Sequence, residues 1–253
     1  MGNICILDFD GVYQQEDFYK SYEYQWIDFT DLKGVNGYCE HHSLFEIQKA
    51  ILPYAGKHLS FLGNGNYHYI AYLYLAMIKE PFSLLHFDHH TDTQTSLFSE
   101  LISCGSWLEK ALLQLPNLKH VVSVGVRNDQ KKDIQPSYQE KIRCISEKEA
   151  VSLTWDSIEP LLKEEDVYIS LDKDVIRREE TITNWDQGIL SKHKILSFME
   201  SCLQEKNVVG IDVCGEYAED MGGSMIEQEH AYFINNGMNE EVVELCERMG
   251  YLL

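Results

Sequence analysis

Residues 82–92 read FSLLHFDHHTD and are the most informative part of the sequence. It begins with an apolar run over 82–87 that has the length and composition of a buried strand. It ends in Asp88, His90 and Asp92, each two residues from the next. A strand that ends in a loop can turn such side chains toward one point at its carboxyl end, where open α/β sheets carry their binding sites. Two carboxylates and an imidazole suit a divalent first-row metal such as manganese, iron or zinc.

The composition is that of a folded, acidic protein. Hydrophobic residues make up 44% of the 253 residues, which is enough for one large α/β domain over residues 1–253. The formal net charge of −20 disfavours nucleic acid as a partner, because its phosphates would be repelled. Seven cysteines without a C-x-x-C pair indicate reduced thiols, and the sequence shows neither a signal peptide nor an apolar run of about 18 residues. We therefore expect a soluble cytoplasmic protein, compatible with an oligomer, that binds neither nucleic acid nor membrane.

Apolar runs typical of strands alternate with amphipathic patterns along the chain. Strands are expected over 4–9, 59–62, 82–87, 121–126, 142–145, 167–171 and 208–213. Helices are expected over 44–54, 67–79, 105–113, 155–162 and 191–204, with two more, 224–235 and 239–249, at the end. Residues 14–43 show no clear period and are expected to be irregular. This alternation predicts βαβ units, and so an α/β fold in which a single domain forms a three-layer α/β/α sandwich around a mainly parallel sheet.

Further candidate ligands follow other predicted strands. Asp172 and Asp174 come directly after the strand at 167–171, and His68 lies in the first turn of the helix after the strand at 59–62. The resulting set of six is His68, Asp88, His90, Asp92, Asp172 and Asp174. Six ligands exceed what one metal needs, and carboxylates can bridge, so the set predicts two metals that share Asp88 and Asp172 and lower the pKa of a water between them.

These motifs resemble those of the arginase family, the manganese ureohydrolases, which carry G-G-[DN]-H, D-A-H-x-D and S-x-D-x-D-x-x-D-P motifs. The counterparts here are LGNGNYH at 62–68, DHHTD at 88–92 and SLDKD at 170–174. Shorter similarities occur in the same order at 124–127 (VGVR), 187–191 (QGILS) and 209–213 (VGIDV). The resemblance covers roughly residues 59–217 and implies an arginase-like fold.

The resemblance also implies the metals and the reaction. One manganese would be held by His68, Asp88, Asp92 and Asp172, and the other by Asp88, His90, Asp172 and Asp174. A hydroxide between them, hydrogen-bonded to a catalytic Asp92, would attack a guanidinium carbon and release urea and an amine. The substrate implied is a small guanidine or an arginine-containing peptide, as for the peptide arginases. A planar, resonance-stabilised guanidinium needs such a strong nucleophile, and carboxylates to hold its charge.

The sequence departs from the family's motifs at several places. Two extra residues precede His68, and Arg177 stands where the third motif carries its trailing acid. Cys104 occupies the place of a histidine that shuttles protons in the family, which makes it a candidate catalytic residue. The family's substrate-binding glutamate should follow Asp212 by three residues, where this chain has Gly215.

Glu216, one residue later, is therefore the candidate substrate carboxylate, with Glu219 and Asp220 as alternatives. Two carboxylate–guanidinium hydrogen bonds in parallel would make that contact strong and selective.

Three other functions are weighed against a manganese ureohydrolase. A deacetylase-type amide hydrolase of the same fold would use one zinc and a tandem histidine pair, for which His41 and His42 are candidates without the expected glycine-rich setting. A non-catalytic homologue would keep the metal ligands alone. Asp8-Phe9-Asp10 resembles the nucleophile motif of haloacid-dehalogenase-type phosphatases, but the later acidic motif of that family is not found in register.

Overall fold

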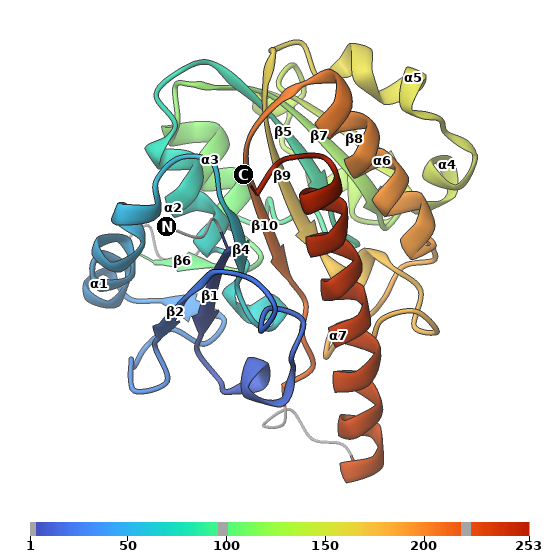
Figure 1. The fold of residues 1–253 in the computed structure, drawn as a ribbon. Helices are drawn as coiled ribbons and strands as arrows, with labels where there is room; N and C mark the ends of the chain where they lie inside the picture. The colour runs from blue at the N-terminus through green and yellow to red at the C-terminus, as the bar shows by residue number, and fades with distance from the viewer. Residues whose placement is uncertain (1–3, 96–100, 219–223, 253) are drawn as a thin grey trace.

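The computed structural model describes residues 4–95, 101–218 and 224–252, and its centre is a parallel sheet (Figure 1). The eight strands of this sheet in the described ranges lie in the order β2-β1-β4-β10-β9-β5-β7-β8. Their bounds are β1 Ile4–Asp8, β2 Tyr24–Asp28, β4 Leu59–Phe61, β5 Phe82–Phe87, β7 Leu118–Val126, β8 Ile142–Ser146, β9 Asp166–Asp172 and β10 Asn207–Cys214. A separate antiparallel pair joins β3 (Tyr38–Cys39) to β6 (Ile102–Ser103).

Helices cover both faces of the sheet, as Figure 1 shows. One face carries α1 (His41–Ile51), α2 (Ile70–Met77) and α3 (Trp107–Gln114). The other carries α4 (Glu147–Ser152), α5 (Trp155–Ile158), α6 (Lys192–Glu205) and α7 (Met225–Arg248). Side chains alternate between the two faces of a strand, so Leu84 packs in the first core and Leu85 in the second. The predicted three-layer sandwich with a mainly parallel sheet is confirmed.

The strand β5 is buried along its whole length because it lies between β7 and β9 with a helical layer on each face. This explains why its sequence is a continuous apolar run, since central strands of parallel sheets have no solvent-facing side. The edge strand β2 differs: it lies within residues 14–43, where no regular structure was expected, and its sequence YQWID is only partly buried. That expectation was wrong because an edge strand needs no apolar run.

The closing helix is also longer than expected. A single helix, α7, replaces the two predicted over 224–235 and 239–249, and Gly237 lies inside it. A glycine within a helix costs only about 1 kcal/mol relative to alanine, so it did not end this one. The second half of α7 supplies Val242, Val243 and Cys246 to the core.

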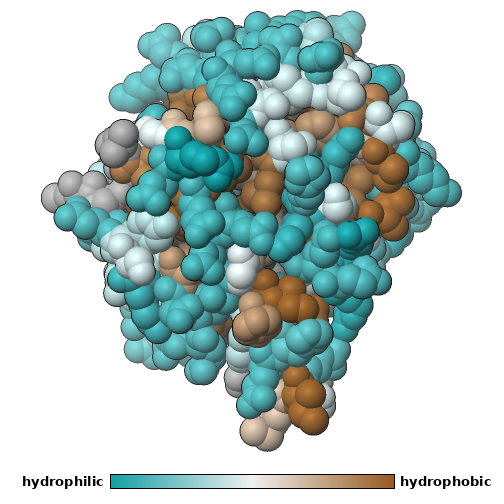
Figure 2. Space-filling view, turned by 45° about the vertical axis from the view of Figure 1, so that its right-hand side comes forward, coloured by the Kyte–Doolittle hydropathy of each residue, from teal (hydrophilic) through white to brown (hydrophobic). Residues whose placement is uncertain are grey.

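The first half of α7 extends past the sheet and exposes apolar side chains. Met225, Ile226 and Phe233 are exposed, and Figure 2 shows apolar surface at this projecting lower end of an otherwise largely hydrophilic face. None of the described helices is both long and apolar enough to span a membrane.

The sheet topology brings four strand ends together. The carboxyl ends of β5 and β9 lie side by side, with Phe87 paired with Leu171, and β10 pairs with both β9 and β4. All strands in the sheet run parallel, so the loops that follow these strands emerge at one edge. The predicted ligands occur in these loops or at the strand ends.

Candidate metal centre

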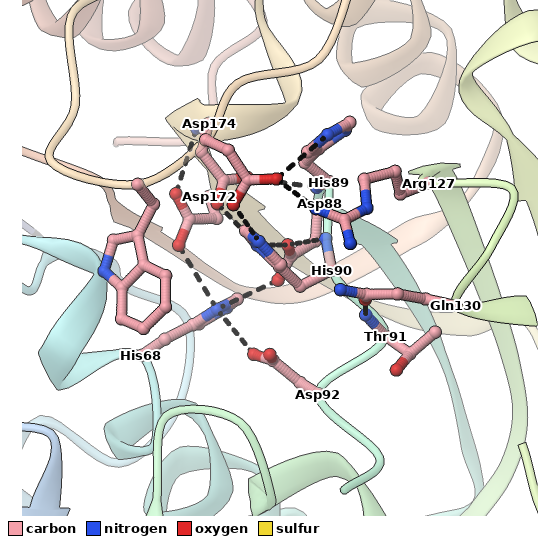
Figure 3. Close-up of polar contacts among 12 residues, drawn as sticks. His68, Asp88, His89, His90, Thr91, Asp92, Arg127, Gln130, Asp172 and Asp174 are labelled. Carbon is pink, nitrogen blue, oxygen red and sulfur yellow. Dashed lines mark hydrogen bonds and ion pairs between the residues drawn. The ribbon is translucent and has the colours of Figure 1, made fainter. Parts of the chain in front are cut away.

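Figure 3 shows the six predicted ligands gathered at this edge of the sheet. His68 ends a short 3-10 turn after β4, and its ring is buried. Its Nδ1 lies 3.1 Å from Asp92 Oδ2, 3.3 Å from Asp88 Oδ2 and 3.6 Å from Asp172 Oδ2. These four side chains form one cluster of donor atoms.

The second cluster surrounds His90. The Nδ1 atom of His90 lies 2.8 Å from Asp174 Oδ2 and 3.5 Å from Asp88 Oδ1. The two oxygens of Asp88 thus face different histidines, which is the arrangement of a carboxylate that bridges two positions. Asp172 differs, because only its Oδ2 faces a ligand histidine, His68. The Oδ1 atoms of Asp88 and Asp172 each accept a backbone hydrogen bond, from the amides of His90 and Asp174 respectively.

A hydrogen-bonded chain sets the orientation of the His68 ring. Ser170 donates its hydroxyl proton to Asp212 at 2.8 Å, so its oxygen is free to accept from His68 Nε2–H at 2.9 Å. His68 Nδ1 then carries a lone pair, and this buried nitrogen has no hydrogen-bond partner among the described residues. A histidine that ligates a metal through one ring nitrogen typically has its other ring nitrogen fixed by such a hydrogen bond.

The distances in both clusters fit a dication. Two donors bound at right angles with bonds of about 2.1 Å lie about 3.0 Å apart. The His68–Asp92 and His90–Asp174 separations of 3.1 and 2.8 Å are close to this value. The residues present therefore fit the metals that the sequence predicts, with oxygen and nitrogen donors that suit a first-row divalent ion.

The buried carboxylates of the cluster repel one another, and a bound cation would stabilise them. Burial, reinforced by repulsion from Asp88, raises the pKa of Asp92 and of Asp172. Burial and the neighbouring Asp172 and Asp88 carboxylates hold the pKa of Asp174 well above its ordinary value. For Asp88, burial opposes ionisation, but the neighbouring His68, His86 and His90 rings outweigh it and hold its pKa well below the ordinary range. A bound dication would relieve the repulsion among these carboxylates.

Several residues of the site were not found from the sequence. His86 Nε2 lies 3.1 Å from Asp88 Oδ2, while its Nδ1 contacts Ser123 Oγ at 2.9 Å. The signal for His86 was present, because it precedes Asp88 by two residues in a strand and so shares its face. Trp107 donates its indole N–H to Asp92 Oδ2 at 2.6 Å, and Asp186 contacts His90 Nε2 at 3.0 Å. These two come from distant segments, and no local pattern marks them.

The backbone of Asp92 is unusual. It has a φ of 49°, and it is the non-glycine residue with positive φ in the described ranges. Aspartate tolerates this left-handed conformation better than most residues, and such conformations cluster at functional sites. The turn it makes presents its carboxylate both to His68 and to the indole of Trp107.

A cavity of about 380 Å³ opens onto the clusters. Its lining includes five of the six predicted ligands together with Cys104, while Tyr38 and Trp185 contribute partly exposed aromatic rings. The remaining lining residues are Gly37, Gly65, Asn66, Gln94, Ser103 and Gly105. Burial and the nearby Asp92 raise the pKa of Cys104 to about 12, so this side chain is a thiol at neutral pH.

Glu216 does not line this cavity. It is buried and forms an ion pair with Lys173, whose ammonium also lies 3.2 Å from Asn239 Oδ1. A side chain at the preceding Gly215 would clash, because its Cβ would lie 2.5 Å from Asp172 Oδ1 and the backbone φ is +92°. The structure therefore does not bring Glu216 to the cavity, and Glu219 and Asp220 lie outside the described residues.

The residues that suggested the alternative functions are also not part of the cavity lining. His41 and His42 are exposed in the first turn of α1 and are not among the lining residues. Asp8 accepts hydrogen bonds from the Gly11 amide and from Gln14, in a closed turn after β1. Asp10 accepts one from Asn64. These contacts account for both acids as parts of local structure.

Comparisons with known proteins agree with the sequence motifs. The model of the Arginase family matches residues 8–218. An uncharacterized protein from Thermotoga maritima is 32% identical over 214 residues, which is 85% of this chain and 80% of that protein.

Solved structures share the fold at low identity. A hypothetical agmatinase from Burkholderia thailandensis has a TM-score of 0.69 at 18% identity, over 98% of this chain and 86% of that one. The arginase from Bacillus caldovelox has a TM-score of 0.67 at 16% identity, over 95% and 98% of the two chains. A formiminoglutamase from Trypanosoma cruzi, determined with Mn²⁺, has a TM-score of 0.65 at 10% identity, over 96% and 93%. With the family model matched over most of its length, the chain belongs to the arginase family.

Proposed function

We propose that this chain is a dinuclear manganese hydrolase that cleaves a guanidinium C–N bond and releases urea. The observation that carries the proposal is the position of Asp88, whose two oxygens face His68 and His90 so that two donor sets share one carboxylate beside a cavity. When bound, two such dications lower the pKa of a shared water toward 7 and so make hydroxide available at neutral pH. The choice of manganese is supported by the Mn²⁺ in the Trypanosoma cruzi formiminoglutamase.

Asp92 is proposed to orient the attacking water. Its carboxylate lies 3.1 Å from His68 Nδ1, and the indole N–H of Trp107 holds Oδ2 at 2.6 Å. A carboxylate held from one side in this way keeps lone pairs for a water at the other. Its geometry is therefore set before substrate arrives, which is what efficient catalysis requires.

The cavity suits a planar cation. Its volume of about 380 Å³ fits a small molecule or one side chain. Tyr38 and Trp185 offer aromatic faces on which a guanidinium can stack, and the carboxylates can hold its charge. None of the lining residues in the described part of the chain is Lys or Arg. We therefore propose a small guanidine or the arginine side chain of a peptide as the substrate, and a cytoplasmic setting because all seven cysteines are free.

Cys104 and Glu216 receive different roles in this proposal. Cys104 lies in the cavity wall but remains a thiol, so we propose that it shapes the cavity and transfers no proton. Glu216 was expected to hold the substrate guanidinium, but its ion pair with Lys173 supports a role in positioning the turn that carries Asp172 and Asp174.

The test is reconstitution of metal-depleted protein. The protein is loaded with Mn²⁺ or with Zn²⁺, and urea release is measured over a panel of free guanidines and arginine-containing peptides, with Asp88→Asn as the inactive control. The proposal expects urea only from the manganese-loaded wild type. Release of acetate from acetylated amines by a one-zinc form would instead favour the deacetylase function, and two bound Mn²⁺ with no guanidine hydrolysed would overturn the reaction proposed.

A further inference from the structure

Cys214 lies against the metal centre, although no motif pointed to it. It is the last residue of β10, it is paired in register with Asp172, and its side chain is buried. Its Sγ lies 3.2 Å from Asp172 Oδ2. A sulfur and an oxygen bound to one zinc ion lie about 3.0 to 3.5 Å apart for bond angles between 90° and the tetrahedral value. The observed separation therefore fits two ligands of one ion.

His68 supplies a second and independent observation. Ligand atoms of His68, Asp172 and Cys214 all lie within 4.8 Å of one another. The Nε2 atom of His68 is held by Ser170, which leaves Nδ1 as the nitrogen that is buried and without a hydrogen-bond partner in the described ranges. This unpartnered nitrogen faces the carboxylates beside which the thiol lies.

We propose that Cys214 is a thiolate ligand of the His68-side metal position, which binds Mn²⁺ when that is the only dication offered but takes a thiophilic dication such as Zn²⁺ or Co²⁺ in preference when both are present. The inference rests on the proposed two-metal centre and assigns one of its positions. Thiolate is a soft donor and selects zinc-like ions, whereas oxygen donors suit manganese. The His90 side, made of Asp88, His90 and Asp174, contains no sulfur among the described residues and keeps its preference for harder ions.

The binding step is balanced by a released proton. The S–H bond of Cys214 breaks, a metal–sulfur bond forms, and the proton passes to the buffer, as occurs when cysteine binds zinc in other sites. Without a metal, the thiol donates its proton toward Asp172 Oδ2, and this contact keeps Sγ beside the ligand set.

The experiment uses Co²⁺ as a spectroscopic substitute for zinc in the full-length chain. A cobalt–thiolate bond produces a charge-transfer band in the near ultraviolet, while the visible d–d bands report bound cobalt whatever its ligands are. We expect the charge-transfer band in wild type and its loss in Cys214→Ser with the d–d bands kept. Cys202→Ser is the matched control, because Cys202 is buried in α6 outside every candidate metal cluster of the described residues.

Cys104 must be tested separately because it lines the same cavity. Cys104→Ser should keep the charge-transfer band. If Cys214→Ser and Cys214→Ala both fail to fold, this variant still tests the inference, because loss of the band in it would assign the sulfur ligand to Cys104. Competition between Zn²⁺ and Mn²⁺ should shift at least tenfold toward Mn²⁺ in Cys214→Ser. Absence of the band in cobalt-loaded wild type, or an undiminished band in Cys214→Ser, would overturn the inference. The cobalt measurements contain no substrate, so their outcome does not depend on whether the protein hydrolyses guanidines.

Discussion

Lys173 and Glu216 form an ion pair in which both side chains are fully buried, directly behind the turn that carries Asp172 and Asp174. Asn239 of α7 contacts both partners, with its amide donating to Glu216 Oε1 at 2.8 Å. Lys173 is flanked in sequence by two proposed ligands but points its ammonium away from the cavity, whose lining does not include it. The pair therefore connects the ligand turn to the closing helix.

Replacing Glu216 by glutamine should lower stability more than substrate binding. The change leaves the Lys173 ammonium buried without its ion-pair partner, and breaking a buried ion pair costs about 3 to 5 kcal/mol. Urea denaturation should show this loss, while KM for the guanidine changes less than threefold. A tenfold higher KM at unchanged stability would restore Glu216 to the role of substrate carboxylate.

Replacing Trp107 by phenylalanine should slow the reaction without emptying the site. The indole N–H bonds Asp92 Oδ2 at 2.6 Å, and a hydrogen bond to a charged group contributes about 1.5 to 3 kcal/mol, which corresponds to a fall in kcat of tenfold or more. Trp155→Phe is the matched control, because Trp155 makes the same type of bond to Glu205, away from the cavity lining. Equal rates for the two variants, with metal content measured on the same samples, would count against Asp92 as the residue that orients water.

Replacing Cys104 by serine should change kcat/KM less than tenfold. Burial raises the pKa of this thiol to about 12, so it does not exchange protons near neutral pH as a shuttle must. Steady-state rates on protein with verified metal content provide the test. A loss of several orders of magnitude with the metals retained would make Cys104 a catalytic group.

The stability of the protein should fall in acid through His58. Burial lowers the pKa of this histidine to about 4, below the ordinary value of 6.5. A depressed folded-state pKa means that the unfolded chain binds the proton first, so stability is present above about pH 6.5 and is lost as the pH falls toward 4. The shift corresponds to about 3 kcal/mol. Chemical denaturation from pH 7 to pH 4 should show this loss in wild type, and His58→Gln should reduce it; identical pH profiles would refute the assignment.

Much of the fold could be predicted because buried parallel strands have a continuous apolar sequence. The strand β5 begins and ends at the predicted residues, Phe82 and Phe87. The edge strand β2 has no such run, and the break expected between residues 235 and 239 is absent because α7 continues through it. Local sequence does not encode how much of an element the rest of the chain covers.

The candidate site could be predicted where its residues follow strands at fixed spacing. All six proposed ligands lie together, as the pattern after β4, β5 and β9 indicated. Sequence spacing could not give the direction of a side chain in a turn, so Glu216 was expected in the cavity and Cys214 was overlooked. Cys214 is the last residue of β10, and Glu216 follows two positions later. The positive φ of Gly215 between them turns the two side chains in different directions.

Metal stoichiometry shows whether two metals share Asp88. Metal-depleted wild type, Asp88→Ala and Asp129→Ala are equilibrated with Mn²⁺, dialysed, and analysed for manganese per folded chain; Asp129 is an exposed acid and serves as the control. We expect two ions per chain in wild type and in Asp129→Ala, and loss of both in Asp88→Ala. A single ion in wild type, or two ions retained in Asp88→Ala, would mean that Asp88 is not shared by two metals.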